Sequence, residues 1–309
     1  MPADSPDAPW SVGIRALLID IDGVLVLRGR PVPGAAEALA RLEAAAIPYR
    51  LATNTSAMSR RSIAAHLTSV GVPATAERII SAASAAADHV AVRHRGGRIF
   101  LLTTRDGRTE FEGRGLHLLT DDEVDRSLAP DRSQAAEGMP RADPGADAVV
   151  IGDASDALTF RDLDRAFGLI HRGADFIAMH RNRWWLTPRG TTLDAGALVA
   201  GLEYSSERHA TLAGKPSPTF FAAGIRAMAL EVGRPRLRRA EVAMVGDDLW
   251  NDVLGAQRAG LRGIFVRSGK HGDAELADAA RRVRRGGRPD LVMDDIAAVV
   301  ARLVASLGR

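Results

Sequence analysis

The chain contains no cysteine, which excludes disulfides, thiolate metal sites and cysteine nucleophiles. It also lacks any apolar run of the roughly 18 residues that a helix needs to cross a bilayer. The first residues, 1–7, are acidic and rich in proline, unlike a secretory signal with its basic start and apolar stretch. We therefore expect a cytoplasmic protein with no membrane partner.

Lysine is almost absent too, because only Lys215 and Lys270 occur among the 41 basic residues. The formal net charge is nevertheless only +3. The densest basic cluster, residues 281–288, has no interleaved aromatic side chains on which nucleic-acid bases could stack. We interpret this cluster as a solvated face and expect no nucleic-acid partner.

With 309 residues, 46% of them hydrophobic and 26% charged, the chain has the composition of a globular protein and the length of two domains. Helical and strand periods alternate along it, which indicates an α/β fold with a parallel sheet. A break at 95–97 precedes a separate strand–helix–strand pattern, so a smaller α/β domain is expected as an insertion. Residues 121–147 are acidic and rich in proline and glycine, and we expect a long surface loop there.

Asp20 and Asp22 follow an almost uninterrupted apolar run at 14–19, the pattern of a central parallel strand. Their side chains point roughly the same way, and Gly23 lets the chain leave the sheet. Two carboxylates this close repel unless a cation or a proton lies between them. Asp-x-Asp-Gly can also be a simple turn. A turn, a divalent-metal site and a nucleophile beside an acid/base all fit this segment alone.

Further polar residues follow later predicted strands in order: Thr53-Asn54, Lys215, and Asp247-Asp248 with Asn251 and Asp252. Each group alone is commonly a turn, a helix cap or a solvated side chain. Ligands of open α/β sheets bind outside the carboxyl ends of the strands, where these groups would meet. Lys215 is a stronger candidate for a functional residue because the chain uses arginine almost everywhere else. The ordered set therefore predicts one site.

The chemistry of this set fits a phosphoryl group. Carboxylates repel an anionic phosphate, so Mg²⁺, which prefers hard oxygen ligands, is needed between them. One Asp of the first pair can attack phosphorus and form an aspartyl-phosphate, while the other protonates the leaving oxygen and later activates water. Thr53 and Asn54 can donate hydrogen bonds to phosphoryl oxygens, and Lys215 can stabilise the charge of the transition state. Acidic residues at 247 and 248 would complete the metal shell.

The same motifs resemble those of the haloacid dehalogenase (HAD) superfamily of phosphohydrolases, with Asp20-Ile21-Asp22-Gly23-Val24 as the first and Gly246-Asp247-Asp248 as the fourth. About 160 residues separate Thr53 from Lys215, a spacing similar to the NagD-like subclass with a C2-type cap inserted there. The runs Thr53-Asn54-Thr55-Ser56 and Gly214-Lys215-Pro216-Ser217-Pro218 resemble the phospholysine phosphohistidine inorganic pyrophosphate phosphatase group.

The resemblance implies a Rossmann-like, doubly wound parallel-sheet core over 1–84 and 191–309, with a smaller α/β cap domain over 85–190. Among catalytic groups, Asp20 would be the nucleophile and a metal ligand, and Asp22 the acid/base with its backbone carbonyl on Mg²⁺. Lys215 would bridge the phosphoryl group to Asp20. Related capped enzymes often dimerise, so a homodimer is a further expectation.

The remaining roles that the resemblance implies concern the phosphoryl group and the metal. Thr53 and Asn54 would hold the phosphoryl group. Asp247 would be the third metal ligand, and Asp248 and Asp252 would support it.

The segment after residue 179 belongs to the expected cap and is of the kind that closes over such a site. Asn182 is a candidate substrate contact, and Arg181 or Arg183 could meet an anionic substrate. A surface turn in an arginine-rich chain explains these residues equally well. Trp184-Trp185 is expected to be packing.

A Mg²⁺-dependent phosphatase for a small phosphorylated metabolite is the leading hypothesis. A phosphotransferase or phosphomutase uses the same motifs, and a non-catalytic phosphometabolite-sensing module is the third reading. Some relatives carry Ser in place of Asp22, so its retention here favours phosphomonoesters, while pyrophosphate and phosphoamidates stay open. Ser268-Gly269-Lys270-His271 suggests a P-loop, but its first glycine is misplaced and no Ser or Thr follows the lysine.

Overall fold

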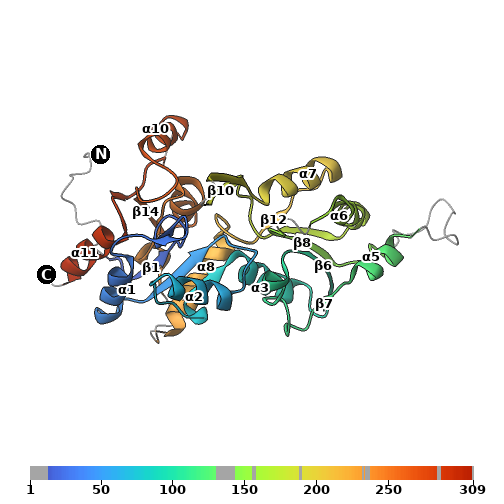
Figure 1. Ribbon diagram of the computed structural model, residues 1–309, viewed down its shortest axis with the longest axis horizontal. Helices are drawn as coiled ribbons and strands as arrows, with labels where there is room; N and C mark the ends of the chain where they lie inside the picture. Colours follow the sequence, from blue (N-terminus) through green and yellow to red (C-terminus); the bar gives the residue numbers. More distant parts are fainter. Residues whose placement is uncertain are drawn as a thin grey trace.

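The computed structural model describes residues 13–129, 143–154, 158–187, 190–231, 233, 237–283 and 287–307. These residues form two parallel sheets, each flanked by helices, which confirms the expected α/β class. Figure 1 shows one sheet with α1 and α11 at one end of the molecule and the other sheet with α5 and α6 at the opposite end. Within these residues, no helix is long and apolar enough to cross a membrane.

The larger sheet has six strands in the order β15-β14-β13-β1-β4-β5, and every pairing is parallel. Successive connections run outward from the central β1 in both directions, as in a doubly wound sheet. Such a change of direction opens a crevice at the carboxyl ends of the central strands. The strands are β1 Ala16–Ile19, β4 Tyr49–Thr53, β5 Ile79–Ser81, β13 Val242–Gly246, β14 Arg262–Val266 and β15 Leu291–Met293.

The smaller sheet has five parallel strands in the order β12-β9-β8-β6-β7. They are β6 Arg98–Leu102, β7 His117–Leu118, β8 Ala148–Ile151, β9 Asp175–Ala178 and β12 Thr211–Leu212. Because β12 pairs with β9, this sheet continues past residue 190, the end of the predicted cap. We therefore propose that the cap ends after Leu212; the boundary between 84 and 85 stays a prediction. Two antiparallel hairpins complete the strands: β2 Val26–Leu27 with β3 Arg30–Pro31, and β10 Trp184–Thr187 with β11 Gly190–Leu193.

Helices cover the faces of both sheets. The α-helices are α1 Ala35–Ala44, α2 Arg60–Ser69, α3 Ala82–Arg93, α4 Arg105–Arg108, α5 Asp121–Leu128, α6 Phe160–Arg172, α7 Gly196–Ser206, α8 Pro218–Glu231, α9 Leu254–Arg258, α10 Asp273–Arg282 and α11 Ile296–Leu307. Short 3₁₀ turns lie at η1 Ala76–Arg78 and η3 Arg239–Glu241, and a π-helix at η4 Leu249–Val253. Several α-helices have typical capping residues at their ends. For example, Thr159 caps the start of α6, and Gly173 ends this helix in the left-handed conformation.

The expectation of a long loop over 121–147 is wrong at its start, because α5 occupies Asp121–Leu128. The Thr120 hydroxyl accepts a hydrogen bond from the backbone amide of Glu123, and the Glu123 carboxylate accepts one from the backbone amide of Thr120. Three acidic residues in the first turn also suit the positive end of the helix dipole. Val124 is its one fully buried side chain, so the apolar pattern that would predict the helix is weak. Residues 130–142 lie outside the described part of the chain.

The central strand β1 is buried on both faces, as its apolar run predicts. Leu17 and Ile19 face the layer of α1 and α11, and pack in a cluster with Leu42 and Leu303. Leu18 points to the opposite face, toward the α8 side chains Phe221 and Met228. Helices thus hold β1 from both sides and fix the position of the residues that follow it.

Replacing Leu42 tests this packing. Its side chain is fully buried in α1, and we expect Leu42→Ala to lower the free energy of unfolding by about 2–5 kcal/mol because it leaves a cavity. Leu230 on α8 is 79% exposed, and Leu230→Ala should change stability by no more than about 0.5 kcal/mol. Urea unfolding followed by circular dichroism measures both. Equal midpoints for the two variants would contradict the packing.

Candidate active site

The parallel topology brings the predicted residues to one edge of the six-stranded sheet. Asp20 follows β1, Thr53 ends β4 and Asp247 follows β13, and β1 lies between the other two strands. The chain returns from the smaller sheet through Lys215, just before α8. All these side chains line one cavity of about 370 Å³. The same cavity holds the other candidate residues of the sequence: Asp22, Asn54, Asn182, Asp248, Asn251 and Asp252.

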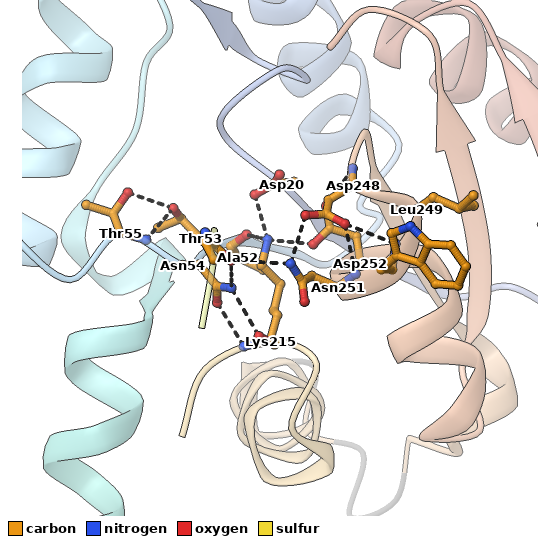
Figure 2. Close-up of polar contacts among 12 residues, drawn as sticks. Asp20, Ala52, Thr53, Asn54, Thr55, Lys215, Asp248, Leu249, Asn251 and Asp252 are labelled. Carbon is orange, nitrogen blue, oxygen red and sulfur yellow. Dashed lines mark hydrogen bonds and ion pairs between the residues drawn. The ribbon is translucent and has the colours of Figure 1, made fainter. Parts of the chain in front are cut away.

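The Lys215 ammonium lies at the centre of the polar contacts. Its Nζ is 2.7 Å from Asp20 Oδ1 and 2.7 Å from Asp252 Oδ1, and it donates to the Ala52 carbonyl at 2.9 Å (Figure 2). Burial alone would lower the pKa of Lys215, but the two carboxylates outweigh burial and raise it. The side chain therefore carries a fixed positive charge inside the site, and two counter-charges compensate for its loss of water.

Asn54 fixes the backbone of Lys215 with two hydrogen bonds. Its Oδ1 accepts from the Lys215 amide at 2.8 Å, and its Nδ2 donates to the Lys215 carbonyl at 3.0 Å. Nδ2 also donates to Asn182 Oδ1 at 3.1 Å. Asn54 is thus a positioning residue for the lysine, in addition to any contact with a phosphoryl oxygen. Thr53 Oγ1 accepts from the Thr55 amide at 3.0 Å, which orients its hydroxyl at the end of β4.

Asp20, Asp247 and Asp252 form a buried cluster of carboxylates. One oxygen from each lies within 4.8 Å of the others. Burial, followed by the charge of Asp20, raises the pKa of Asp247 to about 8, and the same two causes raise that of Asp252. A divalent cation would remove this repulsion, and oxygen ligands of this kind suit Mg²⁺. The donor set therefore fits such an ion, with Asp252 close enough to join the ligands predicted from the sequence.

Two glycines make room for the Asp247 carboxylate. A Cβ on Gly23 would lie 2.1 Å from Asp247 Oδ2, and a Cβ on Gly269 would lie 1.9 Å from the same atom. Gly23 also has a φ of +82°, which side chains other than glycine rarely adopt. The amide of Lys270 donates to Asp247 Oδ2 at 2.6 Å. Segments after β1 and β14 thus enclose this carboxylate from two sides.

Asp248 supports the site as an N-cap. Its Oδ1 accepts from the amides of Trp250 and Asn251, both at 3.0 Å, and so begins the π-helix η4 that carries Asp252. Burial would raise the pKa of Asp248, but the charge of Lys270 and its hydrogen bond lower it to about 2. The π-helix η4 is followed directly by the short α9. π-Helical turns occur frequently at functional sites.

Asp22 stands beside the carboxylate cluster, with an exposed side chain that opens on the cavity. Neighbouring protein atoms displace water from part of the carboxylate, and this effect, followed by the charge of Asp20, raises its pKa to about 6. A raised pKa favours a carboxyl group that can hold and release a proton. The predicted contact of its backbone carbonyl with the metal stays a prediction.

The cap segment after β9 reaches the core through the candidate residue Asn182, whose contact with substrate stays a prediction. Asn182 Oδ1 accepts from Nδ2 of Asn54 and, at 3.2 Å, from Nδ2 of Asn251. Neither Arg181 nor Arg183 lines the cavity, and Arg181 forms an ion pair with Glu203. A direct contact of these arginines with an anion is therefore not supported.

The paired tryptophans do more than pack. Trp184 and Trp185 begin the hairpin strand β10, whose alternation points them to opposite faces. Trp185 lines the cavity, which the sequence did not predict.

Lys270 is the functional candidate that sequence reasoning missed. It lines the cavity, and its Nζ is 2.7 Å from Asp248 Oδ2. The incomplete P-loop pattern at 268–271 offers no motif that would indicate this lysine. The scarcity of lysine could have indicated it, because both lysines of the chain, Lys215 and Lys270, lie in the site.

Substitution of Gly269 tests the enclosure of Asp247. Gly269→Ala would place a methyl group on the carboxylate, and we expect the affinity for Mg²⁺ to fall about 10- to 100-fold, as for other changes around metal ligands. Gly201→Ala on α7 is the matched control, since nothing lies within 4 Å of its added Cβ. Isothermal titration calorimetry measures both affinities. Unchanged binding in Gly269→Ala would contradict the place of Asp247 in the metal site.

Comparisons with known proteins agree with this geometry. A haloacid dehalogenase-like hydrolase model matches residues 17–117, and a HAD-hydrolase-like model matches residues 212–299. The haloacid dehalogenase-like hydrolase domain-containing protein 2 of Bos taurus is 33% identical over 262 residues, covering 85% of this chain and 87% of its own. The human phospholysine phosphohistidine inorganic pyrophosphate phosphatase is 30% identical over 272 residues, with the same two coverages. The resemblance to this group is confirmed.

Solved structures share the whole architecture. NagD from E. coli K-12 is 26% identical, with a TM-score of 0.74, and the match covers 92% of this chain and 97% of NagD. The glycerol phosphate phosphatase Rv1692 of Mycobacterium tuberculosis in complex with magnesium is 26% identical, with a TM-score of 0.73 over 94% of this chain and 78% of its own. A further structure of that phosphatase contains calcium. The chain therefore belongs to the haloacid dehalogenase-like hydrolase family and has the architecture of that family's phosphatases.

Proposed function

We propose that this protein is a Mg²⁺-dependent phosphohydrolase that acts through an aspartyl-phosphate on a small phosphorylated metabolite. One observation carries the proposal: Asp20 pairs with the buried Lys215 ammonium and belongs to one carboxylate cluster with Asp247 and Asp252, at the wall of an open cavity. A carboxylate held by a fixed cation next to a metal-ligand cluster can act as a nucleophile toward a phosphoryl group.

The residues that would hold the ion are the side chains of Asp20 and Asp247 and the backbone carbonyl of Asp22. Asp252 lies within reach of the same position. When bound, Mg²⁺ would neutralise phosphoryl charge and orient the substrate. The magnesium in the related glycerol phosphate phosphatase supports this choice, and its calcium complex shows that another divalent ion can enter that protein.

The side chains of Asp20, Asp22 and Lys215 have separate roles in the two steps, formation and hydrolysis of the aspartyl-phosphate. An oxygen of Asp20 attacks phosphorus, the bond to the leaving oxygen breaks, and Asp22 gives that oxygen a proton. In the second step Asp22 takes a proton from water, the water attacks phosphorus, and the bond to Asp20 breaks to release phosphate. Lys215 stabilises the charge that develops on the phosphoryl oxygens in both steps.

The cavity favours a small substrate with a partly apolar leaving group. Its volume is about 370 Å³, and its lining includes the apolar or aromatic side chains of Met58, Trp185 and Leu186. Phosphomonoesters fit the proton donor at Asp22 best, because an alkoxide leaves poorly without a proton. The name of the human relative adds pyrophosphate and phosphoamidates as candidates.

The variant Asp20→Asn tests the proposal. Without the nucleophile, we expect Mg²⁺-dependent phosphate release to fall by about a thousandfold or more, with chain folding unchanged. Asp88→Asn is the control, because Asp88 lies on α3 and does not line the cavity. Release of phosphate from p-nitrophenyl phosphate and a panel of phosphorylated metabolites, without an added acceptor, measures the activity. Turnover that requires an acceptor would indicate a phosphotransferase, and binding without turnover would indicate a sensing module.

The variant Asp22→Asn tests the proton donor separately. Loss of a general acid costs about 10²- to 10⁴-fold, and the loss should be largest for alkyl phosphates such as glycerol phosphate. p-Nitrophenolate leaves readily without a proton, so the first step with p-nitrophenyl phosphate should slow much less. Single-turnover rates of the first step for the two substrates give this comparison. Equal losses would contradict the role of Asp22 as the proton donor.

A further inference from the structure

Two side chains of the cap meet the core around one carboxylate, Asp248. Asn182 and Trp184 lie two residues apart in the segment that runs from β9 into β10. Each touches a different core residue, Asn251 and Lys270 respectively. Both of these core residues contact Asp248 Oδ2, so the two cap contacts converge on one atom.

The first contact between cap and core is a hydrogen bond between the side-chain amides of Asn182 and Asn251. Asn251 Nδ2 donates to Asn182 Oδ1 at 3.2 Å and to Asp248 Oδ2 at 2.8 Å. One side-chain NH₂ group thus joins a cap oxygen to a core carboxylate. A movement of the cap that removes Asn182 would release one of these two bonds.

The second contact runs through Lys270. Its Nζ lies 2.7 Å from Asp248 Oδ2 and 5.6 Å from the centroid of the Trp184 ring. Only 18% of its side chain is exposed, and that of Asp248 is 10% exposed. A partly desolvated ammonium over a tryptophan face is a favourable cation–π contact. Lys270 therefore has a carboxylate of the core and an aromatic ring of the cap as its two neighbours.

Through Asp248, a movement of the cap can affect the carboxylates of the cluster formed by Asp20, Asp247 and Asp252. It caps η4, which carries Asp252, and Asp252 contacts Lys215 and belongs to the carboxylate cluster. The amide of Lys270 itself donates to Asp247 Oδ2. Ser268 Oγ donates to the Gly23 carbonyl at 2.6 Å, which ties the segment before Lys270 to the loop after β1. A displaced cap would thus act on residues 247, 248 and 252 together.

We propose that Lys270 is a positioning residue that couples the cap hairpin β10–β11 to the carboxylates of the metal site. With Trp184 over its ammonium, Lys270 holds Asp248 as the cap of η4 and keeps Asp247 and Asp252 in place. The inference rests on the proposed function for the identity of the metal site, but the coupling itself needs no turnover.

A double-mutant cycle between the two partners tests the coupling. Lys270→Gln removes the charge, and Trp184→Leu removes the aromatic face from the half-buried hairpin position. Two quantities are measured for the full chain: Mg²⁺ affinity by calorimetry, and hydrogen exchange of the backbone amides over 184–187 and 190–193. Lys270→Arg is the conservative variant, because guanidinium can also pair with a carboxylate and stack on a ring. Circular dichroism confirms that each variant is folded.

We expect each single variant to weaken Mg²⁺ binding and to speed exchange in the hairpin. The double variant should be little worse than either single one, with a coupling of about 2- to 30-fold, the range of cation–π contacts. Lys270→Arg should restore most of both quantities. Leu193→Ala and Arg267→Gln are controls with near wild-type values: Leu193 lies opposite Trp184 but is 72% exposed, and Arg267 is a cation near Lys270 that does not line the cavity.

Additive effects of Lys270→Gln and Trp184→Leu would overturn the coupling. So would a Lys270→Gln variant that raises only the KM for substrate while Mg²⁺ affinity and hairpin exchange stay unchanged, because Lys270 would then contact substrate instead. If the Lys270 variants do not fold, Trp184→Leu alone decides, since unchanged Mg²⁺ affinity in that variant also overturns the proposal. A wild-type chain that releases no phosphate would refute the proposed function, while the exchange and binding data would still decide the coupling.

Discussion

The arrangement of the site depends on one buried ammonium between two carboxylates. Lys215 pairs with Asp20, after β1, and with Asp252, in η4, so three segments far apart in sequence meet at one charge. Removal of the lysine would leave buried, mutually repelling carboxylates, which is costly in a medium with little water. Even with the lysine present, three ionised carboxylates at Asp20, Asp247 and Asp252 would carry more negative charge than it can balance, and the pKa of Asp247 and of Asp252 is raised, first by burial and then by the charge of Asp20. Such a cluster favours a divalent cation, and the bound cation would in turn attract the phosphoryl group of the proposed substrate.

Lys215 also lies at the point where the chain returns from the inserted cap to the core. The lysine follows β12, the edge strand of the smaller sheet, and precedes α8, which packs on the larger one. The amide of Gly214 donates to the Met179 carbonyl at 2.7 Å, and the Lys215 backbone is held by Asn54 at the end of β4. The chain therefore passes from cap to core at the residue that orders the active site. The cap is therefore connected to the active site in two ways. The chain itself runs from β12 through Lys215 into the core, and Asn182 and Lys270 make contacts between the cap and the core.

Local patterns predicted what depends on neighbours in sequence. The apolar run before Asp20 indicated a strand buried on both faces, and the order of polar residues after successive strands indicated one site. Features that depend on tertiary contacts could not be predicted from these local patterns. Arg181 looked available to an anion, yet it pairs with Glu203 of α7.

Other features escaped prediction because their local pattern is too weak. β12 has only two residues, so its membership of the smaller sheet could not be recognised from periodicity. The π-helix at η4 arises where Asp248 caps a helix whose first turn must also present Asp252 to Lys215. Lys270 follows a strand that carries no acidic motif, and its contacts with Asp247, Asp248 and Trp184 arise only in the folded chain.

In the proposed mechanism, Asp20 forms a bond to phosphorus during turnover. The direct measurement is rapid acid quench of the wild-type protein with Mg²⁺ and a turned-over phosphomonoester, followed by borohydride reduction and peptide mass spectrometry. An aspartyl-phosphate is reduced to an alcohol, so we expect reduction at Asp20 that depends on both substrate and Mg²⁺. Reduction at another carboxylate, or sustained turnover with Asp20 never modified, would contradict it.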